Sequence, residues 1–138
     1  MNFLIDSDWL IDFLKGRNQA VKFMSGVDPE SIFISVISYG EIYQGILLGK
    51  NRTRNERSFS EFVASVAIVD IDSPTMRIFA SIRGNLERSG RRLSDMDLLI
   101  ASTAIRHDLT LVSRNLRHFD RIDGLRLYSP ANEPVSES

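Results

Sequence analysis

The sequence predicts an α/β fold in which a parallel sheet is covered by helices on both faces. Short runs rich in Val, Ile and Phe alternate along the chain with longer segments whose apolar residues recur at helical spacing. The alternation continues without a repeat or an internal linker as far as residue 128. We therefore expect one domain, residues 1–128, followed by a polar, flexible tail, residues 129–138.

The first half of the chain contains two predicted strands and three predicted helices. The uninterrupted apolar run in residues 2–6 (NFLID) predicts a short buried strand, and the following DWLIDFLK has a helical pattern that Gly16 ends. Residues 18–25 favour a short helix before the turn VDPES. The β-branched IFISV, residues 32–36, predicts the second strand, and ISYGEIYQGILLG predicts a helix that ends near Gly49.

The second half continues the same alternation. Pro74 is suited to the first turn of a long helix, and the SGRR segment after it favours a break. The predicted elements are an amphipathic helix over 53–64, a strand over 65–72, a helix from Pro74 to about Ser89, a helix over 96–107, a strand over 110–113, a short turn RNLRHF and a last strand over 125–128.

Composition excludes several classes of protein. Hydrophobic residues make up 43% of the chain and charged residues 25%, as in ordinary globular domains. No apolar run approaches the roughly 18 residues that a membrane span needs, and acids interrupt the N-terminal segment, so neither a span nor a signal peptide is expected. The chain has no cysteine, which rules out disulfides and thiolate metal sites and favours a cytoplasmic location.

A net charge of −1 conceals a concentration of arginine between residues 50 and 94. The arginine fork donates two parallel hydrogen bonds to a phosphate, so such a cluster can serve a nucleic-acid site even in a near-neutral chain. Any single one of these arginines is more simply explained as part of a solvated helix face.

Acidic residues fall where three predicted strand–helix units reach the same edge of the sheet. Asp6 ends the first strand, Asp8 opens the next helix, and Glu41 lies early in the helix after the second strand. Asp97 begins a helix that leads into the strand at 110–113, which places it on the carboxyl edge as well. Functional crevices in such sheets lie at this edge.

Helix capping is the competing explanation for each acid. Asp6 or Asp8 could cap the first helix, Ser38-x-x-Glu41 has the form of a capping box, and Ser94 or Asp95 could cap the helix at 96–107. In that helix Asp95 and Asp97 also complement the positive end of the helix dipole. Capping does not explain why several acids meet at one edge, where they repel by several kcal/mol, about 4 at 4 Å.

A cation would relieve that repulsion. With two histidines and no cysteine, a tetrahedral zinc site has little support. Oxygen ligands suit Mg²⁺ or Mn²⁺, which in many nucleases position a water and stabilise charge on a phosphodiester.

Four segments, taken in order, resemble PIN-domain ribonucleases, most closely the VapC toxins of toxin–antitoxin systems: FLIDSDWLIDFLKG, ISVISYGEIYQG, LSDMDLLIASTA and TLVSRNLRHFDRIDGLRL. The resemblance runs from Met1 to about Tyr128. It implies a three-layer sandwich with a five-stranded parallel sheet, and a Mg²⁺-dependent endoribonuclease. The resemblance assigns metal-binding and catalytic roles to Asp6, Glu41 and Asp97. It also maps the family's Thr/Ser-x-Asn motif to Ser113 and Asn115, in a supporting or substrate-binding role. We expect Asp8 and Arg114 to support the site as well.

The resemblance also implies partners. These are an RNA substrate, a small antitoxin that blocks the acidic groove, and a second copy of the chain in a homodimer; no membrane is expected. Two positions differ from the family pattern, because His118 stands where relatives often carry an acid and Asp8 replaces a common asparagine. Asp8 could compensate for the missing acid.

Two other readings remain to be weighed. A PIN fold could serve as a non-catalytic or housekeeping RNA-binding module, although the three core acids argue against it. The Asp6–Ser7–Asp8 sequence is also similar to phosphatases with an Asp-x-Asp pair and to receiver domains, but both families use a lysine late in the chain, and none follows Lys50.

Overall fold

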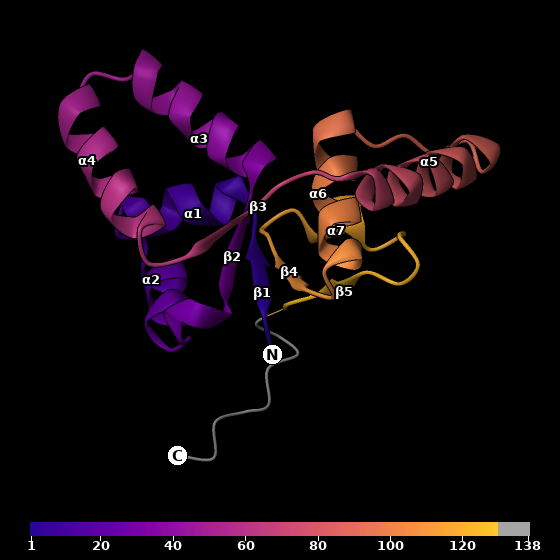
Figure 1. The fold of residues 1–138 in the computed structure, drawn as a ribbon, viewed down its shortest axis with the longest axis horizontal. Helices are drawn as coiled ribbons and strands as arrows, with labels where there is room; N and C mark the ends of the chain where they lie inside the picture. Colours follow the sequence, from indigo (N-terminus) through magenta and orange to yellow (C-terminus); the bar gives the residue numbers. More distant parts are fainter. Residues whose placement is uncertain (130–138) are drawn as a thin grey trace.

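The computed structural model describes residues 1–129 and confirms the predicted α/β sandwich. One sheet of five parallel strands has the order β3-β2-β1-β4-β5, so β1 is central (Figure 1). Nearly all of the predicted tail lies outside the described residues. The strands are β1 (Phe3–Ile5), β2 (Ile32–Ser35), β3 (Ala67–Val69), β4 (Thr110–Val112) and β5 (Arg126–Leu127).

Helices cover both faces of this sheet. One core cluster joins the sheet to α1 through α4, and a second joins it to α6 and α7. The helices are α1 (Ser7–Leu14), α2 (Asn18–Ser25), α3 (Val36–Leu48), α4 (Arg52–Val63), α5 (Ser73–Arg88), α6 (Asp95–Arg106) and α7 (Leu116–Phe119), with a 3₁₀ turn at Pro29–Ser31.

Neighbouring residues of the central strands point to opposite faces. Leu4 and Leu111 are fully buried against α6 and α7, whereas Ile5 and Val112 are fully buried against α1 and its neighbours. Each of these central strands therefore needs side chains that can be buried on both faces of the sheet. This requirement explains the uninterrupted apolar runs in the sequence.

Several helix starts differ from the prediction. Helix α1 begins at Ser7, and Asp6 is its N-cap instead of the last strand residue. Helix α3 begins at Val36, capped by Ser35, because the Ser35 hydroxyl accepts a hydrogen bond from the Ile37 N–H at 3.1 Å. The predicted turn RNLRHF contains the short helix α7.

Strand β3 is the largest difference in length. The prediction of a strand over 65–72 gives way to Ala67–Val69, because β3 lies at the edge and pairs only with β2. Asp72 leaves the strand direction to cap α5, and its carboxylate accepts a hydrogen bond from the Thr75 N–H at 2.9 Å.

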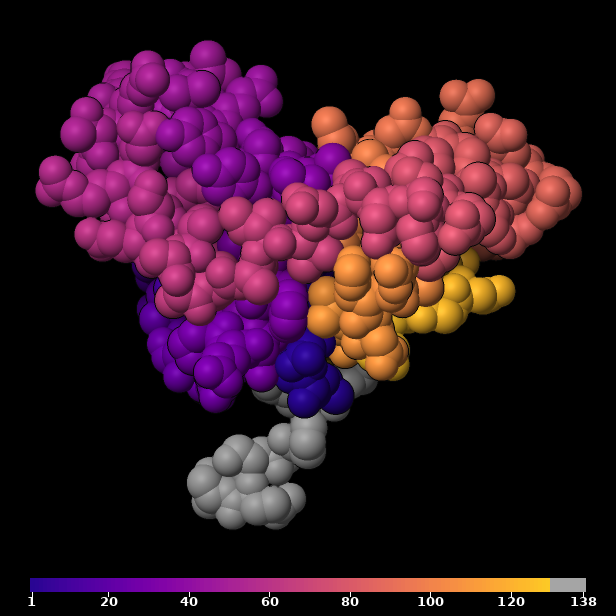
Figure 2. All heavy atoms as spheres, viewed as in Figure 1, coloured from indigo at the N-terminus to yellow at the C-terminus, as the bar shows by residue number. Residues whose placement is uncertain are grey.

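The carboxyl edge of the sheet lies between two projecting groups of helices. Helices α3 and α4 project on one side, and α5 and α6 on the other (Figure 1). The surface dips between these two arms (Figure 2). After β1 the chain forms β2 on one side of it and later β4 on the other, so β1 and β4 flank a topological switch point, where α/β sheets bind ligands. Within residues 1–129, the helices are too short or too polar to cross a bilayer.

Candidate active site

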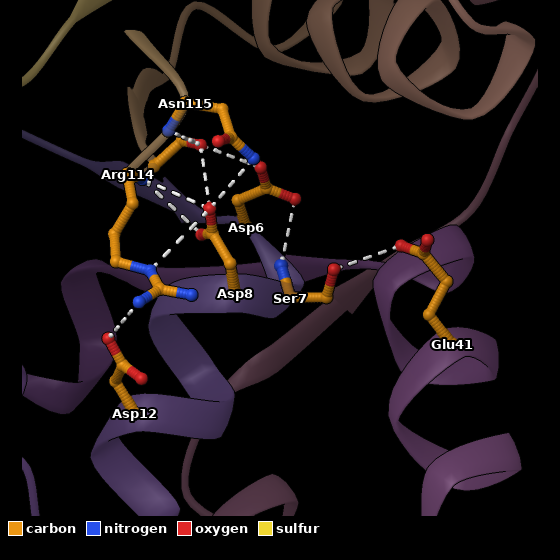
Figure 3. A network of polar contacts seen from close by, with 8 residues as sticks. Asp6, Ser7, Asp8, Asp12, Glu41, Arg114 and Asn115 are labelled. Atoms are coloured by element: carbon orange, nitrogen blue, oxygen red, sulfur yellow. Dashed lines mark hydrogen bonds and ion pairs between the residues drawn. The ribbon is translucent and has the colours of Figure 1, made fainter.

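Asp6 occupies the topological switch point. Its N–H donates to the Val112 carbonyl at 2.9 Å, one step beyond the paired residues Ile5 and Val112. One carboxylate oxygen accepts from the Ser7 N–H and the other from the Ser113 hydroxyl, both at 2.8 Å (Figure 3). The capping interpretation of Asp6 is thus correct, but capping uses only one of its two oxygens.

The environment of Asp6 opposes its charge. The residue is 4% exposed. Burial, and then the neighbouring charge of Asp8, raise the pKa of Asp6 from 3.8 to about 6, against the lowering effect of the bonds from Ser113 and Ser7; Asp97 raises it further. A buried carboxylate at this pKa lacks a counter-charge among the side chains around it.

Asp8 is held by the loop that follows β4. One of its oxygens accepts from the Arg114 N–H and from the Asn115 side-chain amide, each at 3.2 Å, and lies 3.4 Å from the Ser113 hydroxyl (Figure 3). Burial nevertheless raises the pKa of Asp8, while the Arg114 N–H lowers it. The structure therefore brings together five of the candidate site residues: Asp6, Asp8, Ser113, Arg114 and Asn115.

Glu41 approaches the same edge from α3. Its carboxylate accepts a hydrogen bond from the Ser7 hydroxyl at 3.0 Å, and Ser7 also donates its N–H to Asp6 (Figure 3). The capping-box interpretation of Glu41 is wrong. Because Ser35 caps α3, Glu41 lies in the second turn, and the buried Ser38 hydroxyl has no hydrogen-bond partner among the described residues.

Three residues at the start of α6 have separate tasks. Ser94 is the cap, since its hydroxyl accepts from the Asp97 N–H at 3.2 Å. Asp95 forms an ion pair with Arg83 of α5. The Asp97 side chain is free of both tasks and lies 3.3 Å from Nδ1 of His118. Two of the three polar residues at this helix start are thus explained structurally, and Asp97 is left for the site.

Two residues of the site were missed from the sequence. Ser7 links Asp6 to Glu41, and Asp12 forms an ion pair of 3.3 Å with Arg114. The signals were present: Ser7 lies between two of the predicted acids, and Asp12 follows Asp8 by one helical turn. Arg114 thus spans Asp8 and Asp12, with its Nε 4.0 Å from Asp8 (Figure 3).

The donor set fits a hard divalent cation. Carboxylate oxygens lie at this edge on the β1–α1 junction (Asp6), on α1, on α3 and on α6, and the raised pKa of Asp6 marks negative charge that its neighbours do not neutralise. In residues 1–129, no three acidic or histidine side chains already converge as a complete metal-binding group. Glu41 of α3 and Asp97 of α6 are the further carboxylates that could join Asp6 and Asp8 in such a group.

Comparisons with known proteins agree with this architecture. Residues 3–125 match the family model described as PIN domain. Ribonuclease VapC2 of Rickettsia felis is 33% identical over 97 residues, covering 70% of this chain and 72% of the relative. The tRNA(fMet)-specific endonuclease VapC of Shigella flexneri is 27% identical over 126 residues, covering 91% and 96%.

Solved structures show the same fold. The structure of VapBC2 from Rickettsia felis bound to a promoter DNA fragment contains a chain that matches with a TM-score of 0.85 and 26% identity, covering 93% of this chain and 98% of that one. DNA-bound VapBC from Salmonella typhimurium contains a chain that matches with a TM-score of 0.85 and 26% identity, covering 93% and 97%.

Proposed function

The chain belongs to the PIN-domain family, and from this we infer that it is an endoribonuclease of the VapC type, which hydrolyses RNA phosphodiester bonds with a divalent metal ion. The observation that carries the proposal is the meeting of Asp6, Asp8, Glu41 and Asp97 at one edge of the sheet. Capping accounts for one oxygen of Asp6 and for none of the contacts of Glu41 or Asp97.

We propose that Asp6, Glu41 and Asp97 bind the metal ion. The ion is Mg²⁺, and Mn²⁺ can substitute for it. Both ions take oxygen ligands, whereas the neutral imidazole of His118 is a poor Mg²⁺ ligand. A bound ion of this kind supplies positive charge that activates a water and stabilises the phosphorane-like transition state. The all-carboxylate set and the buried, raised-pKa Asp6 support this assignment.

The protein's own residues hold the reactive groups in position. Ser7 and Ser113 fix both oxygens of Asp6, so this carboxylate presents the same face to the cleft in every turnover. Asn115 and the Arg114 N–H fix Asp8 beside it. The Arg114 guanidinium, 57% exposed, can donate to a phosphate oxygen of the substrate. No side chain acts as a covalent nucleophile: water adds its oxygen to phosphorus, the bond from phosphorus to one ribose oxygen breaks, and that oxygen leaves as a hydroxyl after taking up a proton.

Metal-dependent cleavage of RNA tests the proposal. Purified chain, free of any partner, should degrade a pool of cellular RNA with Mg²⁺ and stop when the metal is chelated. Asp6→Asn, Glu41→Gln and Asp97→Asn should each remove the activity, whereas Glu61→Gln, an exposed carboxylate of α4, should keep it. Sequencing the new RNA ends would identify the RNA and the bond. If the chain binds RNA but never cuts it with all acids intact, the non-catalytic RNA-binding module is the correct alternative.

We further propose that the chain is the toxin of a toxin–antitoxin pair. The support is that similar solved chains come from VapBC complexes and that relatives include Toxin FitB of Neisseria gonorrhoeae. A small antitoxin would cover the acidic cleft and could fill a neighbouring hollow of about 460 Å³, where Ile11, Leu14 and Ile42 are among the lining residues.

Expression in growing cells tests the toxin proposal. The chain alone should arrest growth, and co-expression of the adjacent small reading frame should relieve the arrest. If the chain with its acids unchanged does not slow growth, the toxin proposal is wrong, and the nuclease proposal stands separately. Light scattering would test the homodimer that the family implies.

A further inference from the structure

A basic hollow adjoins the acidic site on the side of α7. It lies between the loop that joins α5 to α6 on one side and α7 with the residues that follow it on the other. Four arginines line it: Arg91, Arg92, Arg117 and Arg121. We call this set the arginine basin. The hollow has a volume of about 150 Å³ and adjoins a larger one of about 810 Å³, which shares Arg91 and Arg92.

These four arginines lack acidic partners. Among residues 1–129, none of the four forms an ion pair, although other arginines nearby do. Arg83 pairs with Asp95, and Arg106 with Asp72. The lining of the smaller hollow contains no carboxylate, and that of the larger one contains Glu87 and the already paired Asp95. The basin therefore has an excess of positive charge directed at one space.

His118 connects the basin to the acidic site. Its side chain lines the smaller hollow, and its Nδ1 lies 3.3 Å from the carboxylate of Asp97. The basin therefore begins one side chain away from a proposed metal ligand. Figure 1 shows α5, α6 and α7 grouped on the same side of β1.

We propose that the arginine basin binds backbone phosphates of the RNA strand on one side of the bond that is cut. This inference rests on the proposed function, because a strand whose scissile phosphate lies at Asp97 would continue past His118 into the basin. Guanidinium groups bind phosphate through paired N–H donors, whereas the acids of the site repel it. The basin thus supplies affinity that the acidic site cannot, and it does so without reading base sequence.

Paired substitutions, each of which removes two positive charges, test the basin. The variants are Arg91→Gln with Arg92→Gln, and Arg117→Gln with Arg121→Gln. The matched control is Arg52→Gln with Arg57→Gln, which removes the same charge from exposed positions on α4. All six positions are exposed, so melting temperatures should stay close to that of the unmodified chain.

Binding is measured by fluorescence anisotropy with a fluorescein-labelled single-stranded RNA, in chelator so that no cleavage occurs. Each basin pair should weaken binding about tenfold or more, and should reduce the slope of log affinity against log salt by about 1.4, or roughly 0.7 for each lost phosphate contact. In Mg²⁺, the KM for cellular RNA should rise while kcat stays within about twofold. The control pair should change neither quantity by as much.

Two results would overturn the proposal. In the first, both basin pairs bind RNA with the affinity of the unmodified chain and with the same slope of log affinity against log salt. In the second, a basin pair keeps its affinity for RNA but no longer binds the antitoxin, which would make the basin a contact surface for that protein. Because the binding measurement uses chelator, it stands even if the unmodified chain shows no cleavage, so failure of the basin and failure of the nuclease assignment give different results.

Discussion

Replacing Asp6 by asparagine should stabilise the metal-free protein near neutral pH. Asp6 is buried, and its pKa is raised to about 6 by burial and by the charge of Asp8. Asparagine has nearly the same shape, and its carbonyl oxygen can still accept one of the two bonds. The Ser113 hydroxyl can reverse its role and accept a hydrogen bond from the new amide. The substitution therefore removes the buried charge with little loss of hydrogen bonding.

The magnitude follows from the raised pKa. In the unfolded chain the carboxyl ionises near 3.8, and in the folded chain near 6. Below the unfolded-state pKa the carboxyl is protonated in both states, so the buried position of Asp6 costs no stability. As pH rises from the lower value to the higher, the unfolded state loses its proton first, and stability falls until the folded carboxyl also ionises. The full loss is about 3 kcal/mol, or roughly 10 °C in melting temperature for a chain of this size.

Urea unfolding in chelator, followed by circular dichroism, measures this difference. The free energy of unfolding of Asp6→Asn should exceed that of the unmodified chain by about 2–3 kcal/mol at about pH 7.5, and by well under 1 kcal/mol at about pH 4, close to the unfolded-state pKa. Glu61→Gln serves as the control for removal of an exposed charge. Mg²⁺ should then stabilise the unmodified chain, by about 2.7 kcal/mol at a hundred times its Kd, and leave Asp6→Asn unchanged. A difference between the two chains that is equal at both pH values would refute the electrostatic reasoning.

Two further predictions concern the site and one of its arms. Asp97→Asn should abolish cleavage, and His118→Ala should lower the cleavage rate about tenfold, or about 1.4 kcal/mol of barrier. The rate of Asn115→Ala should fall between them. Initial rates on cellular RNA measure this order, and a loss in His118→Ala as severe as in Asp97→Asn would contradict it. Phe59 of α4 is 1% exposed, so Phe59→Ala should lower the free energy of unfolding by about 3–5 kcal/mol in urea, whereas Ser58→Ala on the exposed side should change it little.

Much of the fold was predictable because the sheet is buried on both faces. The short, β-branched apolar runs around Leu4, Ile34 and Leu111 favoured buried strands, and the helices between them favoured a parallel sheet. Strand ends were less predictable. Asp6 and Asp72 each leave a strand to cap the following helix, and an acid at such a position fits either role until the backbone turn is known.

Contacts between side chains on different elements were harder to predict. Sequence periodicity placed Glu41 and Asp97 at one edge, but it gave no indication that Ser7 donates to both Asp6 and Glu41. The ion pair of Arg114 with Asp12 depends on how the loop after β4 lies across α1. Such contacts depend on rotamers and loop conformation, which hydrophobic patterning does not determine.

The acids of the site differ in how firmly they are held, and this difference suggests how the site is completed. Asp6 and Asp8 are fixed by backbone N–H groups, the Ser113 hydroxyl and the Asn115 amide, all on rigid elements or the loop after β4. Glu41 has one contact, from the Ser7 hydroxyl, and Asp97 has one, to His118. A residue held by one contact gives up about 1 kcal/mol when it changes rotamer and loses that contact, and the binding of a divalent ion by several carboxylates would exceed this cost. In the metal site that we propose, the β1–β4 edge would therefore supply the preformed half, and Glu41 of α3 and Asp97 of α6 would supply the half that changes conformation when an ion binds.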